Sequence, residues 1–399
     1  MDSTVARNIA RSKDWLSNQV FPLWVKKGID PRDGGFVEAL TLQGETLDLP
    51  RRAMVQARQI YAFRIGMELG CFPETATRAI IARAATFLTE RYSVPSGAFI
   101  HSSDGAGKPR DEQPDLYTQA FALFGLANAY AVSPEAAHKQ RALSLVDYLQ
   151  RERRAPDGGY TEIDNGRFAL RSNPHMHLFE AAIAWMRVDA DPRWKTLAAE
   201  ILDLCLTKFI DPESGALCEY FSAGWTPTRT GGHFVFEPGH HYEWSWLMTL
   251  YEESTGLDLG PVRVRLFQIG EARGLSPEGN AYDEVWSHAV PKKKSSRFWP
   301  QGERTKSAVR MGTHAAKSEQ APFARAADEA FMSLSRFLQT PMPGLWRDTL
   351  LETGHFREEP TKASSLYHII NACDEYIALR PGLSTSEQPF VDVPTPDKG

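Results

Sequence analysis

Two ionisable side chains stand one helical turn apart in the middle of the chain. His240 and Glu243 follow a Pro-Gly pair and precede the aromatic run Trp244–Trp246. Residues at i and i+3 share a helix face, so the carboxylate can orient the imidazole or bind a hydroxyl group beside it. Because an imidazole titrates near neutral pH, this pair suits proton transfer. We expect His240 and Glu243 to act in a functional site and His241 to point elsewhere; helix capping is the structural alternative.

A second polar cluster precedes another apolar run, in the segment Asn173-Pro-His-Met-His177-Leu-Phe-Glu180. Asn173 and His177 lie one helical turn apart, so both can hydrogen-bond the hydroxyl groups of one ligand. The spacing of His175 and His177 could indicate a metal, but no second cluster with zinc-like spacing accompanies it. We therefore predict hydroxyl binding and no metal, with a satisfied core histidine as the alternative.

Five more residues are candidates because they stand where apolar stretches begin: Arg58, Tyr117, Trp299, Glu303 and His368. A buried unpaired guanidinium is costly, which favours a cavity position for Arg58. His368 alone would pass for a core histidine, since it lies on an apolar helix. Tyr117 and Trp299 fit core packing equally well, although the indole could also stack on a ligand ring.

The elements that must position these residues repeat along the chain. Short glycine turns recur at intervals of roughly 60 residues, the sign of a repeat architecture. Most follow an Asp-Pro, Ser-Pro or Pro-Asp breaker, which predicts tight turns with a glycine at positive φ. The turns begin at Gly34, Gly97, Gly158, Gly215, Gly279 and Gly344.

Two kinds of helix are predicted between successive turns. Amphipathic segments with a charged face predict outer helices at 76–92, 135–153, 192–209 and 324–338, and more weakly near 5–21 and 260–274. Segments apolar on every side predict buried inner helices at 59–66, 116–130, 177–187, 244–251, from 307 onward, and at 366–377. Six such pairs close into an all-α barrel of six helical hairpins. The starts of the inner helices then converge at one end, and the polar residues there line a funnel-shaped site.

Composition excludes several other functions. A net charge of −5 in 399 residues gives no general attraction to nucleic acid or anionic membranes, and Lys292–Lys294 fits a solvated loop. The four cysteines lack CxxC spacing, which argues against disulfides and structural zinc and favours a reducing cytoplasm. No apolar segment approaches a membrane span. We predict one catalytic domain over residues 1–382 and a loose Pro-rich tail over 383–399.

At its polar clusters the sequence resembles the N-acylglucosamine 2-epimerase superfamily over nearly its whole length. The shared elements, in family order, are Asn173-Pro-His-Met-His177-Leu-Phe-Glu180, Pro-Gly-His240-His-Tyr-Glu243-Trp, Trp299-Pro-Gln-Gly-Glu303 and Tyr-His368. The resemblance implies an (α/α)6 barrel that interconverts aldoses with ketoses, or epimerises sugars at C2, without a redox cofactor. The Glu-Trp after Pro-Gly-His is most similar to the mannose and sulfoquinovose isomerase branch.

The resemblance also implies roles for individual residues. His240 and His368 are the implied proton-transfer pair, without a decision as to which one abstracts the C2 proton. The residues implied to hold an open-chain sugar are Arg58, Tyr117, Asn173, His177, Glu243 and Glu303. His175, His241 and Gly302 fall at variable positions and are expected to tune substrate choice.

We therefore predict a cofactor-independent aldose–ketose isomerase that interconverts D-mannose, or a relative such as lyxose, with D-fructose through an enediolate. The expected partner is a monosaccharide, and a homo-oligomer stays open. A sugar C2-epimerase is the first alternative. A glycoside hydrolase that uses Glu243 and Glu303 as its carboxylate pair is a weaker one, as is a noncatalytic sugar-binding barrel.

Overall fold

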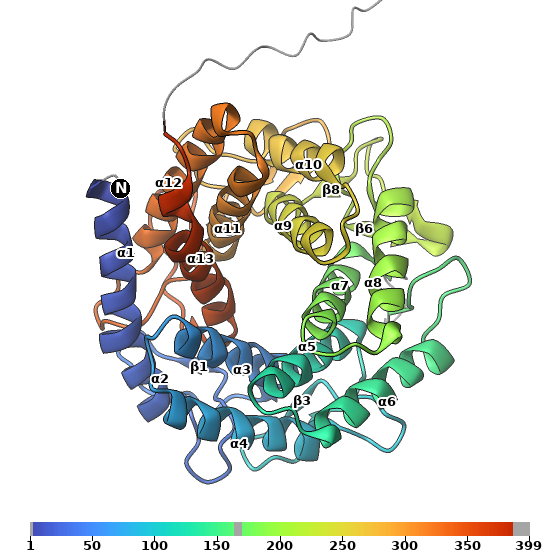
Figure 1. Cartoon of the computed structure of the whole chain (residues 1–399), viewed down its shortest axis with the longest axis vertical. Helices are drawn as coiled ribbons and strands as arrows, with labels where there is room; N and C mark the ends of the chain where they lie inside the picture. Colours follow the sequence, from blue (N-terminus) through green and yellow to red (C-terminus); the bar gives the residue numbers. More distant parts are fainter. Residues whose placement is uncertain (1–2, 163–169, 386–399) are drawn as a thin grey trace, which may run out of the picture.

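Six inner helices form a closed ring in the computed structural model, which describes residues 3–162 and 170–385 (Figure 1). Each inner helix packs against the next, and α13 packs against α3, which closes the ring. The six are α3 (Ala53–Glu68), α5 (Leu116–Val132), α7 (Ser172–Met186), α9 (Pro238–Thr255), α11 (Phe298–His314) and α13 (Leu366–Leu379). The predicted all-α barrel of six helical hairpins is confirmed.

Outer helices cover this ring, as Figure 1 shows. They are α1 (Ser3–Trp15), which continues through a π-helical turn into α2 (Phe21–Lys27), and α4 (Glu74–Tyr92), α6 (Ala136–Glu152), α8 (Pro192–Leu204), α10 (Gly260–Arg273) and α12 (Gln320–Phe337). Each of the last five packs against the inner helix that precedes it, while α1 packs against α13. The sixth hairpin is therefore assembled from the two ends of the chain.

The fifth inner helix begins earlier than predicted. Its apolar run starts at Ser307, but α11 begins at Phe298. The intervening charged residues are buried because each has an opposite charge beside it: Arg304 lies 2.7 Å from Glu271, and Lys306 lies 2.6 Å from Glu303. Pairing of this kind makes burial of a charge tolerable, and hydrophobicity alone does not reveal it.

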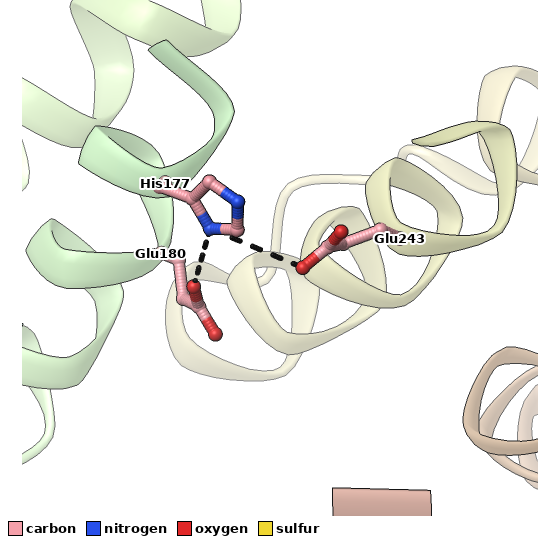
Figure 2. A group of neighbouring side chains, drawn as sticks. All are labelled: His177, Glu180 and Glu243. Carbon is pink, nitrogen blue, oxygen red and sulfur yellow. Dashed lines mark hydrogen bonds and ion pairs between the residues drawn. The ribbon is translucent and has the colours of Figure 1, made fainter. Parts of the chain in front are cut away.

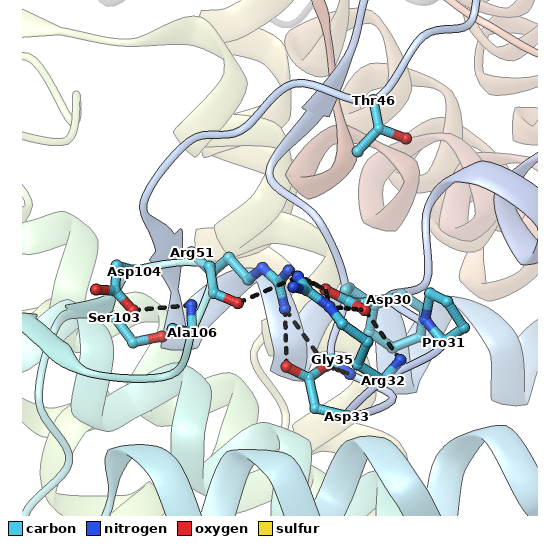
Figure 3. A network of polar contacts seen from close by, with 12 residues as sticks. Asp30, Pro31, Arg32, Asp33, Gly35, Thr46, Arg51, Ser103, Asp104 and Ala106 are labelled. Carbon is cyan, nitrogen blue, oxygen red and sulfur yellow. Dashed lines mark hydrogen bonds and ion pairs between the residues drawn. The ribbon is translucent and has the colours of Figure 1, made fainter.

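All six glycine turns have the predicted backbone. The first glycine of each turn has φ between 71° and 100°, a region that other residues rarely adopt. In the first turn, Asp33 accepts a hydrogen bond from the Gly35 N–H at 2.9 Å, and Arg51 bridges Asp30 and Asp33 (Figure 3). Hydrogen bonds from Arg32 and Arg51 hold the pKa of Asp30 well below its usual range, against the effect of burial.

A buried side chain of the next inner helix binds the backbone just after the turn in five of the six repeats. Gln56, Gln119 and Gln301 each accept a hydrogen bond from one backbone N–H and donate to the C=O of the same residue, at 2.7–3.0 Å. His175 and His241 each accept one such N–H through Nε2 at 3.0 Å and bind a backbone C=O through Nδ1. These two histidines are fully buried away from the cavity, so the expectation that they tune substrate choice was wrong.

Short antiparallel strands connect the repeats at the end of the barrel where the inner helices begin. The pairs and triplets are β1 (Ala39–Leu40) with β13 (Thr361–Lys362); β2 (Arg51–Arg52), β3 (Ser102–Ser103) and β4 (Pro109–Asp111); β5 (Leu170–Arg171), β6 (Tyr220–Ser222) and β7 (Thr226–Pro227); β8 (Val235–Phe236), β9 (Glu284–Trp286) and β10 (Pro291–Lys293); and β11 (Ser296–Arg297) with β12 (Thr349–Leu350). The β1–β13 pair joins the first repeat to the last. These ladders fix the loops around the mouth of the barrel.

The C-terminal boundary predicted at residue 382 stays a prediction. Leu383 is buried, and the Ser384 N–H donates to Gln320 at 2.9 Å, so the chain is still packed there. Residues 386–399 of the predicted tail lie outside the described residues. None of the helices in the described part is both long and apolar enough to cross a membrane.

The two hydrogen bonds between the Gln119 side chain and the Phe99 backbone, here called the Gln119 clamp, can be tested for their contribution to stability. In Gln119→Ala, the buried N–H and C=O of Phe99 lose their partners, so we expect the free energy of unfolding to fall by about 2 kcal/mol. Urea unfolding followed by circular dichroism measures it. The exposed Gln113→Ala is the matched control, and equal stability of both variants would contradict the clamp.

Candidate active site

A cavity of about 360 Å³ opens at the end of the barrel where the inner helices begin. Every candidate site residue except Glu303 lines it: Arg58, Tyr117, Asn173, His177, His240, Glu243, Trp299 and His368. They come from all six inner helices. The predicted convergence is therefore present, and most of these residues lie in the first or second helical turn.

His240 is held as a cation by a carboxylate that the sequence analysis missed. Its Nδ1 lies 2.9 Å from Glu219 Oε2, and Glu219 also accepts hydrogen bonds from Ser172 Oγ and the Glu237 N–H. Burial alone would lower the pKa of His240, but the negative charges of Glu219 and Glu237 outweigh it and raise this pKa to about 10. His240 is thus an imidazolium at neutral pH, with Nε2 left for the cavity.

His368 has the same geometry and the opposite charge state. Its Nδ1 lies 2.7 Å from Glu303 Oε1, while Lys306 Nζ lies 2.6 Å from Glu303 Oε2. Burial, together with the positive charges of Arg58 and Lys306, holds the pKa of His368 well below its usual value. His368 is therefore a neutral imidazole, and it too leaves Nε2 for the cavity.

The indole of Trp299 packs near both imidazoles. The ring centroid of Trp299 is 5.1 Å from that of His240 and 5.6 Å from that of His368. A cationic and a neutral imidazole thus lie near the same aromatic ring at one cavity. Together they offer a proton donor and a proton acceptor to one ligand.

A third histidine, His177, lines the cavity, and Figure 2 shows it beside Glu180 and Glu243. His177 Nδ1 lies 3.0 Å from Glu180 Oε2 and 4.0 Å from Glu243 Oε1. Burial lowers the pKa of His177 to about 3, so it is neutral. The Tyr367 hydroxyl donates a short hydrogen bond to Glu180 and lies 3.5 Å from Glu243, which ties the two carboxylates together.

Arg58 is the cation of the cavity without a carboxylate partner among the described residues. Its guanidinium donates to the Tyr117 hydroxyl at 2.7 Å and to the Ser364 carbonyl at 3.3 Å, and it lies 4.2 Å from the ring centroid of Phe121. Nε has no hydrogen-bond partner in the described structure. An uncompensated guanidinium in a low-dielectric cavity favours negative charge that develops on a ligand.

Two buried oxygens in the cavity also lack partners among the described residues: Asn173 Oδ1 and Glu243 Oε2. An unpaired buried acceptor costs roughly 1–3 kcal/mol, unless a ligand or water supplies a donor. Both residues line the cavity, so hydroxyl groups of a ligand can satisfy them.

Glu303 does not reach the cavity. It is fully buried below His368, and its two oxygens face His368 and Lys306. Glu303 therefore positions a histidine instead of holding a ligand, contrary to the role expected for it. A hydrolase with Glu243 and Glu303 as its opposed carboxylates would need both at the cavity, which this placement does not provide.

Three residues of the site were missed by sequence reasoning: Glu219, Lys306 and Tyr367. Glu219 comes from the loop before β6 and has no helical spacing to His240. Lys306 was left out because the fifth inner helix was predicted to begin after it. Tyr367 directly precedes His368, and only its position on an inner helix could have indicated it.

Three groups of side chains could hold a metal ion by distance: His177, Glu180 and Glu243; Glu219, Glu237 and His240; and Glu243, Glu303 and His368, each with ligand atoms within 4.8 Å of one another. In the third group, Lys306 already places an ammonium 2.6 Å from Glu303 and 3.9 Å from Glu243. A divalent cation at the third position would be repelled by this ammonium.

Carboxylates neutralise the basic residues at the mouth of the cavity. Arg52 binds Glu38, with Nε 2.7 Å from Oε1. Arg297 lies 2.8 Å from Asp283, and Lys362 lies 2.6 Å from Asp348. Among the described residues, these three cations at the mouth are therefore already paired and are not free for an anionic ligand.

This closed ring of six helical hairpins is the (α/α)6 barrel that solved sugar epimerases and a D-mannose isomerase also have. The model of the N-acylglucosamine 2-epimerase (GlcNAc 2-epimerase) family matches residues 34–372. The chain belongs to this family, and it is an isomerase or epimerase.

Three relatives illustrate the similarity. Mannose-6-phosphate isomerase of Rhizobium meliloti (strain 1021) is 38% identical over 371 residues, which cover 90% of this chain and 94% of that protein. The structure of cellobiose 2-epimerase from Bacillus thermoamylovorans B4167 has a TM-score of 0.83 at 20% identity and covers 92% of this chain and 98% of its own. A D-mannose isomerase structure has a TM-score of 0.81 at 17% identity, with coverage of 94% and 98%. At these identities the two structures show the fold alone.

The charge state of His240 can be tested directly. Glu219→Gln keeps the shape of the side chain and removes its negative charge, so we expect the pKa of His240 to fall from about 10 by about 1–3 units. An NMR titration of the imidazole Cε1–H measures this pKa. The exposed Glu278→Gln is the control, and an unchanged pKa in Glu219→Gln would contradict the assigned role of Glu219.

Proposed function

We propose that the protein is an aldose–ketose isomerase that interconverts D-mannose, or a close relative such as lyxose, with D-fructose. One observation carries this proposal: two imidazoles, each bound by a carboxylate through Nδ1, lie near Trp299 at a single cavity. Isomerisation through an enediol needs one base for carbon and one acid for oxygen. His368 and His240 supply them.

The proposed reaction moves one proton between carbons and one between oxygens. Neutral His368 removes the proton from C2 of the open-chain aldose, while the His240 imidazolium donates a proton to the carbonyl oxygen O1. The resulting enediol accepts the proton from His368 at C1, and its O2 hydroxyl returns a proton to His240. Both histidines end as they began, and C2 has become the carbonyl carbon.

The other cavity residues hold the sugar in this proposal. Arg58 stabilises the negative charge that develops on the enediolate oxygens, since its guanidinium has no competing carboxylate in the described structure. Asn173 Oδ1 and Glu243 Oε2 accept from sugar hydroxyl groups. The Trp299 ring stacks on the apolar face of the sugar.

The family supports a second candidate, a C2-epimerase. The specific observation is that two imidazoles, those of His240 and His368, lie at one cavity, because a second imidazole that returned the proton to C2 from the opposite face would give the C2 epimer. Mannose would then yield glucose in place of fructose. The names of two relatives, a mannose-6-phosphate isomerase and a D-mannose isomerase, favour the ketose product.

We expect His240→Ala and His368→Ala each to lower kcat by roughly 10²- to 10⁴-fold, because each removes one proton-transfer group. The assay incubates mannose in D2O and follows fructose, glucose and solvent deuterium at C1 and C2 by NMR. Helical circular dichroism checks that the variants fold.

The exposed His355→Ala serves as the matched control and should keep full activity. Full activity of either cavity variant would contradict the proton-transfer assignment. If the product is glucose with deuterium at C2, the proposed isomerase activity is wrong and the protein is a C2-epimerase.

The paired charges at the mouth favour an uncharged sugar. We expect kcat/KM for mannose to exceed that for mannose 6-phosphate by roughly tenfold or more, since Arg52, Arg297 and Lys362 at the mouth are already paired with carboxylates and leave a phosphate there without a counter-charge. Initial rates with the two sugars measure the ratio, and a preference for the phosphate ester would contradict it.

A further inference from the structure

The barrel contains a second cavity at the end where the inner helices finish. It has a volume of about 260 Å³, near the lower end of the range for small-molecule sites. Every inner helix contributes to its wall, with one residue of each being Tyr61, Asn128, Glu180, Trp246, Arg310 and Asn371. We call it the rear cavity, and the candidate active site the front cavity.

Asn371 is the feature of the rear cavity that calls for a ligand. Its side chain is 1% exposed, and neither its amide nitrogen nor its amide oxygen has a hydrogen-bond partner among the described residues. Burying such an amide unsatisfied costs several kcal/mol in an apolar environment. A group that both donates and accepts, such as a hydroxyl, would satisfy both atoms.

The charges around the rear cavity disfavour an anionic ligand. Arg64 lies 2.7 Å from Glu68, Arg310 lies 2.6 Å from Glu375, and Arg187 lies 3.6 Å from Glu253, so these guanidinium groups are already paired. Asp374 forms no ion pair or hydrogen bond with a described residue and can accept from a hydroxyl group. Its carboxylate would repel an anion.

Most of the remaining wall is apolar, apart from Asn128, Glu180 and Arg187. Ala127, Ile183 and Leu250 line the rear cavity together with the indole of Trp246. Apolar and aromatic walls with a few convergent polar groups are the usual composition of a site for a small hydroxylated ligand.

Glu180 separates the rear cavity from the front one. It lines the rear cavity, while its carboxylate binds His177 Nδ1 and the Tyr367 hydroxyl. His177 lines the front cavity. Glu180 therefore belongs to the wall of the rear cavity and also binds His177, which lines the front cavity.

We propose that the rear cavity is a second binding site for a small uncharged polyhydroxylated molecule, a monosaccharide or polyol, held by Asn371 and Asp374. Its ligand lies against Glu180 and so acts on His177 of the front cavity. Binding at the rear cavity does not depend on the proposed reaction. Only the expected binding of a second mannitol in the front cavity rests on the proposed function.

Equilibrium dialysis of the full-length protein with radiolabelled mannitol tests this site, because mannitol has no carbonyl group and cannot be turned over. We expect two molecules bound per wild-type chain at saturation. Asn371→Leu, which replaces the amide by an apolar group of similar size, should remove the rear molecule or weaken it by roughly tenfold or more. Arg58→Met should remove the front one.

Asp374→Asn is a second rear variant, at a half-buried position, and circular dichroism checks the fold of all variants. We expect it to weaken the same molecule that Asn371→Leu removes. A single mannitol that is lost in Asn371→Leu and kept in Arg58→Met would support the rear site and count against the front one. Mannitol binding that is unchanged in both rear variants would overturn the proposal.

Discussion

Charge buried inside the barrel must be compensated there, and the centre of the molecule is arranged around this requirement. Each histidine at the front cavity binds a carboxylate through Nδ1: His240 binds Glu219, His368 binds Glu303, and His177 binds Glu180. The carboxylate fixes the tautomer and the orientation of each ring, which leaves Nε2 for the ligand. The packing of the inner helices therefore determines where the three Nε2 atoms lie.

The same hydrogen bond gives opposite charge states because the next neighbours differ. His240 has a second carboxylate, Glu237, nearby, whereas Glu303 is shared between His368 and the ammonium of Lys306. Lys306 in turn packs 3.9 Å from the ring centroid of Trp246, so its charge is held by an aromatic face as well. Equivalent helices of the repeat thus carry an acid, His240, and a base, His368. The difference comes from the charged residues that contact these histidines from behind the cavity wall.

Much of this arrangement could be predicted from the sequence. Apolar periodicity separates inner from outer helices, and the position of Arg58, His240 and His368 near helix starts places them at one end. Glu219 could not be found in this way, because a loop residue has no periodic relation to the helix that it serves. Hydropathy also misplaced the start of α11, since paired charges such as Lys306 and Glu303 are buried at little net cost.

One signal was present and was misread. Gln56, His175, His241 and Gln301 each stand two residues before Arg58, His177, Glu243 and Glu303, respectively. The first member of each pair binds the backbone just after a glycine turn. Of the second members, Arg58, His177 and Glu243 line the front cavity, and Glu303 binds His368. The shared spacing marks His175 and His241 as scaffold histidines, which their residue type alone does not.

The sixth hairpin pairs α13, the last α-helix of the described residues, with α1, the first. During synthesis on the ribosome, α1 therefore emerges long before the surface that it covers. His368 lies on that last helix, so the acid–base pair is complete only when the ring closes. A chain that terminates before α13 lacks both the helix that closes the ring and His368. The acid–base pair therefore forms only when the fold is complete.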